Sequence, residues 1–360
     1  MRLGILGIPN SGKTTIFNAL TKSNYETAAV SSGQFEVHTA VVNVPDERLD
    51  RMSAIFKPKK TVYTNVTYVD IGGLDKGMSE GGLKGDVRNV LAQVDGFVHV
   101  VRAFENDNVP HPYETINPQR DLDTLDGEFL LDDLITVEKR IGRINDEIRI
   151  KGKKVEGLYT DELALLERMK AALEDNTPLR DIDITPDEEK MVRGFGLLSL
   201  KPVLVVVNIG DEAKEAAALV QYPHQKSAVV GLRGKLEAEL SQLEDPADAE
   251  MFMEEYNITE LAAPLVIRAS YELLAVQVFF TVGEDECRAW RVRIGATAPE
   301  AAGAIHTDLQ KGFVRAEVMR YEDLLEMGSE AAIKQAGKMR LEGREYIVKD
   351  GDILHIRANA

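Results

Sequence analysis

The chain contains short, mostly apolar runs at residues 2–6, 97–101 and 202–208. Runs of this length are typical of strands that are covered on both faces, as in a parallel sheet. Residues 62–70 instead alternate apolar and polar side chains, which also indicates a strand, and this segment ends at Asp70 with glycines shortly after it. The pattern predicts an α/β fold with a mostly parallel sheet wrapped by helices.

The spacing becomes helical between the second and third runs. Apolar residues repeat at intervals of three and four, first at Leu134, Val137, Ile141, Ile144 and Ile148 and, after a turn at "KGKK", at Leu166, Met169 and Leu173. This spacing is typical of a coiled-coil seam, so residues 128–176 are predicted to form an antiparallel helical hairpin. A shorter helix is predicted from Pro186, with Thr185 as its N-cap and Glu188 completing a capping box.

From about residue 276 onward the chain consists of short alternating runs separated by glycines, which predicts a separate small β-rich domain. The single cysteine, Cys287, lies in one of these runs and is expected to be a semi-buried strand residue. One thiol excludes an internal disulfide and supports neither a zinc site nor a redox pair.

The 360 residues carry a formal net charge of −17. Binding to nucleic acid of any sequence is driven by the release of counterions from phosphates, so this charge argues against it and no DNA specificity is expected. Any contact with RNA is expected to be local. No apolar run is long enough to span a bilayer, and the N-terminal residues lack a signal-peptide core, so we expect a cytoplasmic protein with no membrane partner.

The segment "GIPNSGKT", residues 7–14, has glycines at its first and sixth positions, followed by Lys13 and Thr14. A predicted strand precedes it and a predicted helix at 14–22 follows, which is the context that a phosphate-binding loop requires. Lys13 is expected to reach the β and γ phosphates, and the Thr14 hydroxyl is expected to bind Mg²⁺. The predicted nucleotide-binding residues of this loop are Asn10, Ser11, Gly12, Lys13, Thr14 and Thr15.

Six stretches of the chain resemble the Obg-like ATPases, the YchF-type branch of the translation-factor class of P-loop proteins. They are "GIPNSGKTT", "DIGGLDKG", "HVVRAFEND", "TVEKRI", "RAWRVRIGATAPEAAGAIHTDLQKGFVRAEV" and "GKMRLEGREYIVKDGD". The resemblance implies a GTPase-like P-loop NTPase core at 1–127 and 199–275, an inserted coiled-coil domain at 128–198, and a C-terminal β-grasp (TGS-like) domain at 276–360. It also implies slow hydrolysis of ATP in preference to GTP, and association with ribosomes.

The resemblance assigns roles to individual residues near the phosphates. Asp70 and Gly73 fall on the motif that binds Mg²⁺ and the γ-phosphate, and Leu74 stands where Ras-like enzymes keep a water-positioning glutamine. A leucine cannot orient water, and the family's suspected substitute matches His111 in "ENDNVPHP". A proline-flanked histidine on a loop is more often incidental, so both interpretations of His111 stay open.

Two positions depart from the family pattern. An ungapped alignment puts Gln34 where the family has the first-switch threonine that binds Mg²⁺, with Ser31, Ser32 and Thr39 as alternative ligands. The base-reading segment is Asn208, Ile209, Gly210 and Asp211, where the family has Asn-x-x-Glu and GTPases have Asn-Lys-x-Asp. Asn208 can hydrogen-bond the adenine edge, as the resemblance implies, whereas Asp211 keeps guanine binding open. We expect ATP to be preferred.

These observations predict a nucleotide-dependent switch that slowly hydrolyses ATP, or GTP, and associates with the ribosome or RNA. A guanine-specific GTPase of the same fold and a non-hydrolysing, nucleotide-dependent scaffold stay open as alternatives. A small-molecule kinase is disfavoured because no arginine-bearing lid is recognisable. The expected contacts with ribosome or RNA are Arg315, Arg340 and Arg344 of the TGS-like domain, and "KGKK" at the hairpin tip.

Overall fold

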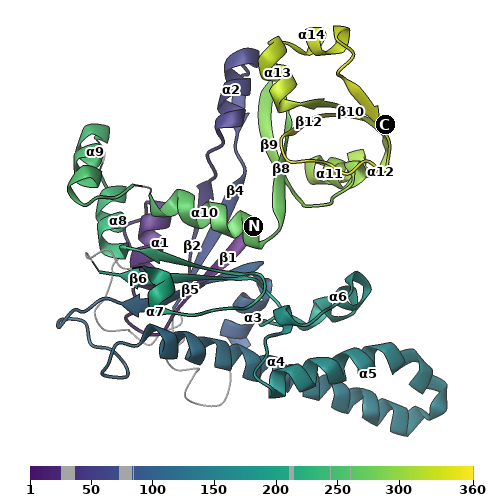
Figure 1. The fold of residues 1–360 in the computed structure, drawn as a ribbon. Coiled ribbons are helices and arrows are strands. Elements are labelled where there is room, and N and C mark those ends of the chain that lie inside the picture. Colours follow the sequence, from purple (N-terminus) through teal and green to yellow (C-terminus); the bar gives the residue numbers. More distant parts are fainter. Residues whose placement is uncertain are drawn as a thin grey trace. The chain divides into compact units, whose positions relative to one another are not determined.

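The computed structural model describes residues 1–25, 37–72, 83, 85–210, 215–243, 245–259 and 261–359. Their contacts divide the chain into two compact units, Met1–Val41 with Thr67–Ala269, and Val42–Val66 with Ser270–Ala360. The boundaries between the units fall within strands β2 (Val37–Asn43) and β4 (Asn65–Ile71) and within helix α10 (Ala262–Leu273). Figure 1 shows these elements.

The first unit is built on a six-stranded sheet. Its other strands are β1 (Arg2–Leu6), β5 (Gly96–Ala103), β6 (Val203–Ile209) and β7 (Ser227–Leu232). The strand order is β2-β4-β1-β5-β6-β7, and the pairs from β4 to β7 are parallel. All seven residues of β6 are buried, as expected for a strand covered on both faces. The predicted α/β fold with a mostly parallel sheet is confirmed.

Helices surround this sheet or extend from it. They are α1 (Lys13–Thr21), α3 (Gly85–Gln93), α4 (Pro118–Lys151), α5 (Lys153–Glu174), α6 (Pro186–Val192), α7 (Ala216–Leu219), α8 (Gly234–Ser241) and α9 (Pro246–Glu255), with short 3-10 helices η2 (Leu179–Asp181) and η3 (Arg193–Phe195). Helix α1 buries Ile16, Phe17 and Leu20, as its spacing predicts. Within the described part of the chain, no helix is both long and apolar enough to cross a membrane.

Helices α4 and α5 form the predicted antiparallel hairpin and lie side by side (Figure 1). The apolar seam is buried between them, with Val137, Ile144, Leu166 and Met169 at 0% exposure. Helix α4 begins at Pro118, ten residues before the predicted start, because Asn117 caps it and a proline suits the first helical turn. The capping box of Thr185 and Glu188 at the start of α6 is confirmed.

The second unit contains another six-stranded sheet. Its elements are α2 (Glu47–Phe56), β3 (Lys60–Val62), β8 (Val276–Thr281), β9 (Glu286–Arg293), α11 (Ala298–Ile305), α12 (Thr307–Lys311), β10 (Phe313–Arg320), α13 (Tyr321–Met327), α14 (Glu330–Gln335), β11 (Arg340–Glu342) and β12 (Asp352–Ala358). The strand order is β11-β10-β12-β8-β9-β3. Helix α11 packs on this sheet and contributes Ala298, Ala301 and Ala302 to its core. The expected C-terminal β-sheet domain is confirmed.

Residues 42–66 belong to the second unit, although the sequence expectation assigned them to the P-loop core. They join it because β3 pairs in parallel with β9 and because Leu49 and Met52 of α2 are buried in the same core as Phe280. The lone cysteine, Cys287, lies on strand β9 as expected, but it is fully buried rather than semi-buried.

Candidate functional site

The loop between β1 and α1 has a backbone that few residue types can form. Asn10 has φ 61° and Gly12 has φ 90°, both in the left-handed region. A Cβ on Gly7 would lie 2.4 Å from the backbone oxygen of Val100, and one on Gly12 would lie 2.2 Å from Asn208 Nδ2. The two glycines of the motif are therefore required by close approach of β5 and β6 as well as by the turn.

The loop directs polar groups toward the space in front of α1. Lys13 Nζ donates to the backbone oxygen of Ile8 at 3.2 Å, which keeps the ammonium group against the loop. The hydroxyl of Ser11 is buried and has no hydrogen-bond partner among the described residues. The first N–H groups of α1 follow directly and carry the partial positive charge of a helix N-terminus. This arrangement suits a phosphate group.

Asp70 lies near the carboxyl end of β4, beside the first turn of α1. Its Oδ2 accepts a hydrogen bond from Thr14 Oγ1 at 3.0 Å, while its buried Oδ1 has no hydrogen-bond partner in the described part of the structure. Burial raises the pKa of the Asp70 carboxyl above its usual value. A divalent cation beside Oδ1 would compensate for that burial, and a hydroxyl and a carboxylate oxygen are ligands that Mg²⁺ accepts. The residues therefore fit a magnesium ion.

No cluster of three or more His, Cys, Asp or Glu side chains that could hold a metal occurs among the described residues. Beside nucleotides, Mg²⁺ is bound by one or two side chains together with phosphate oxygens and water. His38 on β2 approaches the same carboxylate, with its Nδ1 3.9 Å from Asp70 Oδ2, and its ring stacks on Tyr25 at 4.2 Å. No motif in the sequence marks His38 as a candidate site residue.

Asn208 occupies the carboxyl end of β6 and is 3% exposed. Its Nδ2 donates to the backbone oxygen of Ser11 at 3.0 Å, and its Oδ1 accepts from the backbone N–H of Gly234 at 3.1 Å. The side chain thus joins the phosphate-binding loop to the start of α8. An amide has two N–H donors and an oxygen with two lone pairs, so each atom retains capacity for one further bond. The neighbouring Ile209 is mostly buried in the core of the sheet.

His111 lies between β5 and α4, and its side chain is only 3% exposed. Its Nε2 is 2.9 Å from Asp121 Oδ2 in the first turn of α4, and its Nδ1 accepts from the backbone N–H of Tyr113 at 3.2 Å. Both ring nitrogens are therefore engaged by the protein. Asp121 carried no sequence signal of function, because an aspartate in a first helical turn is common for electrostatic reasons alone.

The segment that carries His111 is tied to the phosphate-binding loop. Asn10 Nδ2 donates to the backbone oxygen of Pro110 at 2.8 Å. Arg102, which is 2% exposed on β5, donates to the backbone oxygens of Phe104 at 3.0 Å and Val109 at 2.9 Å. The sequence "VVRAFEND" shows an arginine in a mostly apolar strand, but its hydrogen bonds to the loop backbone are apparent only from the fold.

The structure thus gathers one group of predicted residues at the carboxyl edge of the sheet, where open α/β sheets bind ligands. This group contains Asn10, Ser11, Gly12, Lys13, Thr14, Asp70 and Asn208. Thr15 belongs to the first turn of α1 and Thr39 is exposed on β2. Six further predicted positions lie outside the described residues: Ser31, Ser32, Gln34, Gly73, Leu74 and Asp211.

The three predicted basic contacts of the β-grasp domain differ in their surroundings. Arg315 is exposed on β10. Arg340 pairs with Glu342 at 3.1 Å and its Nη2 lies 3.7 Å from Asp352, while Arg344 donates to the backbone oxygen of Phe313. Neighbouring acids neutralise Arg340, so Arg315 is better placed than Arg340 to meet a phosphate.

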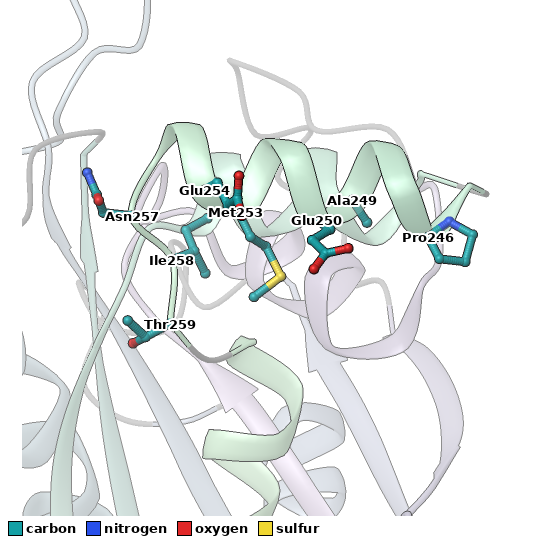
Figure 2. A pocket seen from close by; sticks show the side chains of 8 residues that line it. All are labelled: Pro246, Ala249, Glu250, Met253, Glu254, Asn257, Ile258 and Thr259. Atoms are coloured by element: carbon teal, nitrogen blue, oxygen red, sulfur yellow. The ribbon is translucent and has the colours of Figure 1, made fainter.

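A surface hollow lies along α9. Figure 2 shows its lining, which consists of Pro246, Ala249, Glu250, Met253, Glu254, Asn257, Ile258 and Thr259. Glu250 and Glu254 are among the lining residues, and none of the predicted nucleotide-binding residues that the structure describes lines this hollow. It is therefore separate from the candidate nucleotide site.

Two family models and several known proteins match this chain. A family model described as a 50S ribosome-binding GTPase matches residues 2–138, and the model of the YchF GTPase C-terminal domain, described as a protein of unknown function, matches residues 276–359. The chain is similar to the ribosome-binding ATPase YchF of Bacillus subtilis, at 40% identity over 99% of this chain and 98% of that one. It is equally similar to the Escherichia coli O157:H7 protein of the same name, at 40% identity over 99% of each chain.

Among solved structures, the Schizosaccharomyces pombe YchF GTPase matches with a TM-score of 0.83 and 32% identity, over 99% of this chain and 97% of that chain. The likeness therefore extends over both units of the chain and includes the inserted hairpin.

Proposed function

Because the chain belongs to the YchF family of P-loop proteins, we propose that it is a nucleotide-dependent switch that slowly hydrolyses ATP and associates with the ribosome. The observation that carries the proposal is the meeting of four parts at one edge of the sheet. These parts are the phosphate-binding loop, Asp70 with its buried and unpaired Oδ1 atom, the Asn208 amide and the segment that carries His111. Each supplies a different requirement of nucleotide hydrolysis.

In this proposal Lys13 binds the β and γ phosphates, and the backbone N–H groups of residues 10–15 surround them. The Thr14 hydroxyl and Asp70 would hold Mg²⁺, and Gln34 is the proposed ligand from the first switch. The ion neutralises negative charge on the phosphates when it is bound. Asp70 serves this role well because a buried carboxylate with one unpaired oxygen favours a cation.

Hydrolysis is assigned to His111, with Leu74 and Gly73 forming the apolar and backbone surroundings of the attacking water. Asn10 supports the assignment, because its bond to Pro110 brings the peptide next to His111 against the phosphate-binding loop. Turnover is expected to be slow, because no arginine finger is recognisable in the chain and a partner would have to supply one.

The base is proposed to be adenine. The Asn208 amide keeps one N–H and one lone pair beyond its bonds to Ser11 and Gly234, which is what the adenine N6 and N7 edge requires. Ile209 stands in place of the lysine that stacks on guanine in GTPases. A guanine-specific GTPase stays the alternative, because an aspartate at position 211 can accept hydrogen bonds from guanine N1 and N2.

Competition of ATP and GTP for one labelled nucleotide tests this choice. ATP is expected to compete more strongly. If GTP is favoured by more than tenfold, which is about 1.4 kcal/mol, the ATP assignment is wrong, and Asp211→Ala should then remove that preference.

A second candidate is a scaffold that binds nucleotide without hydrolysing it. It is favoured by the burial of His111, whose two ring nitrogens are both engaged by the protein. Release of inorganic phosphate from ATP separates the two candidates. We expect slow release that depends on Mg²⁺ and His111, whereas no release with or without ribosomes would favour the scaffold.

Association with the ribosome or RNA is proposed from the names of the relatives and from local positive charge, with the cytoplasm as the place of action. The exposed Arg315 of the β-grasp domain and the "KGKK" turn between α4 and α5 are the proposed contacts. Co-sedimentation with ribosomes should weaken as salt rises, and Arg315→Glu should weaken it more than Arg340→Glu. Co-sedimentation that changes neither with salt concentration nor in the Arg315→Glu variant would contradict this assignment.

A further inference from the structure

We propose that Asp121 is a positioning residue that keeps the His111 ring in one tautomer and thereby makes Nδ1 the nitrogen that accepts the proton of the attacking water. This inference rests on the proposed function, in which His111 acts in hydrolysis. Asp121 itself touches neither nucleotide nor water in this account, because it acts only through His111.

The pair has the geometry of a fixed hydrogen bond. Asp121 Oδ2 and His111 Nε2 are 2.9 Å apart, and the two side chains are 0% and 3% exposed. The other oxygen, Oδ1, accepts from Arg120 Nε at 3.0 Å and from Nη2 at 2.8 Å. Both carboxylate oxygens of Asp121 therefore accept hydrogen bonds, and Arg120 holds the carboxylate in the orientation in which Oδ2 meets His111 Nε2.

The tautomer follows from the other ring nitrogen. The backbone N–H of Tyr113 can only donate, so the Nδ1 atom that receives it at 3.2 Å carries no proton. In the neutral ring the proton is then on Nε2 and is donated to Asp121. A carboxylate that accepts from one ring nitrogen fixes the tautomer and stabilises the imidazolium that forms when the other nitrogen takes a proton.

The surrounding loop keeps this pair in place. Arg102 holds the backbone oxygens of Phe104 and Val109, and Asn10 holds that of Pro110, which precedes His111. The bond from Tyr113 is the longest in the set, at 3.2 Å, and it uses the lone pair of Nδ1. In the active arrangement a water molecule replaces the Tyr113 N–H as the donor to His111 Nδ1. This replacement leaves Asp121 and its bond to Nε2 in place.

In the step itself, the water oxygen bonds to the γ-phosphorus while one of its protons passes to His111 Nδ1. The bond between that phosphorus and the bridging oxygen breaks, and the bridging oxygen keeps the electron pair on the departing diphosphate. Asp121 keeps its hydrogen bond to Nε2 throughout and balances the positive charge of the ring. The proton later leaves Nδ1 for solvent or phosphate, which restores the neutral ring.

The test compares Asp121→Asn with Asp123→Asn. In Asp121→Asn the new side-chain amide would donate to Nε2 and place the ring proton on Nδ1, so kcat should fall by roughly tenfold to a thousandfold with KM and nucleotide affinity unchanged. Asp123 lies two residues later in the same helix and is exposed, so Asp123→Asn removes the same charge and should leave kcat unchanged. In a His111→Ala background, Asp121→Asn should cause no further loss.

The outcomes distinguish this inference from the proposed function. If His111→Ala leaves the rate unchanged, the catalytic role of His111 is wrong and the inference fails with it. If His111→Ala slows hydrolysis but Asp121→Asn does not, or if the two losses multiply in the double variant, only the positioning role is overturned.

A measurement on the unmodified protein covers the case in which Asp121→Asn does not fold. Nitrogen chemical shifts of ¹⁵N-labelled histidine, with His111 assigned by its disappearance in His111→Gln, report which ring nitrogen carries the proton. We expect the proton on Nε2 in the nucleotide-free protein. A ring protonated on Nδ1 alone would overturn the proposal.

Discussion

The amide of Asn208 binds the backbone of Ser11, 197 residues away in the chain, through an Nδ2–H···O bond of 3.0 Å. The same side chain accepts from Gly234 N at 3.1 Å, so it fixes the phosphate-binding loop between β6 and the start of α8. Gly12 and Gly234 both permit this approach, because a Cβ on either would lie within 2.6 Å of the amide. The Asn208 side chain therefore helps to shape the phosphate-binding loop.

Asn208→Ala should lower the affinity for both ATP and GTP, with the larger loss for ATP, whose adenine edge Asn208 is proposed to bind. The substitution removes the bonds that position Ser11 and Gly234 and the proposed contact with the base, and the loss of such hydrogen bonds in the complex is expected to cost about 1 to 3 kcal/mol, or roughly fivefold to a hundredfold in affinity. Calorimetric titration with both nucleotides measures it. A loss confined to ATP would show that Asn208 acts on the base alone.

Lys13→Ala should lower nucleotide affinity by roughly a hundredfold or more while leaving the thermal unfolding midpoint nearly unchanged. The reason is that a charge-assisted contact to phosphate contributes about 2 to 4 kcal/mol in a desolvated site. Lys190→Ala is the control, because Lys190 is exposed on α6 and pairs with the neighbouring, exposed Asp187. Micromolar ATP binding by Lys13→Ala would contradict the assignment of the loop.

Arg88→Met should destabilise the first unit more than Arg140→Met does. Arg88 of α3 binds Asp132 of α4 at 2.8 Å, and the side chain of Asp132 is only 9% exposed, so its loss leaves a carboxylate mostly buried and unpaired. We expect a loss of about 2 to 3 kcal/mol in the free energy of unfolding. Arg140 binds Glu162 across the hairpin, where the acid is 16% exposed, and about 1 kcal/mol is expected there.

Denaturant unfolding of the two variants gives the comparison. Arg88 also donates to Thr136 and to the backbone oxygen of Phe195, so α3 is held to the base of the inserted hairpin by one side chain. Equal effects of the two substitutions would mean that Asp132 is hydrated in solution.

The unfolding free energy should fall between pH 6.5 and about 4 because of His99. Its side chain is fully buried beside Asp126 and Arg180, and desolvation lowers its pKa to about 4. Below pH 6.5 the unfolded chain binds a proton at His99 and the folded chain does not. The contribution of His99 to the free energy of unfolding is therefore fully present above pH 6.5. It is lost at up to about 1.4 kcal/mol per pH unit as the pH falls toward 4.

His99→Phe should reduce that pH dependence. The ring already lies among aromatic neighbours, with centroids 6.0 Å from Phe97 and 5.3 Å from Phe129, and neither of its nitrogens has a hydrogen-bond partner among the described residues. Denaturant unfolding at pH 7 and pH 5 checks the prediction. Equal pH dependence in the two proteins would show that His99 titrates normally.

The sequence by itself determined the parts that depend on neighbours along the chain. The strand at 2–6, the loop at 7–14 and the helix after it follow from local pattern, because burial on both faces selects uninterrupted apolar runs and a tight phosphate-binding turn selects glycine. The hairpin seam and the capping box at Thr185 follow for the same reason. Each of these features is encoded within a few residues or helical turns.

Only the tertiary structure decided which side chains meet across long separations. Asn208 pairs with Ser11, His111 pairs with Asp121 in a helix that begins earlier than predicted, and residues 42–66 leave the expected core because β3 finds its partner in β9. A polar side chain can satisfy its hydrogen bonds in many ways, and an edge strand of three residues fits many sheets. The choice among them depends on packing of the whole chain, which no local pattern contains.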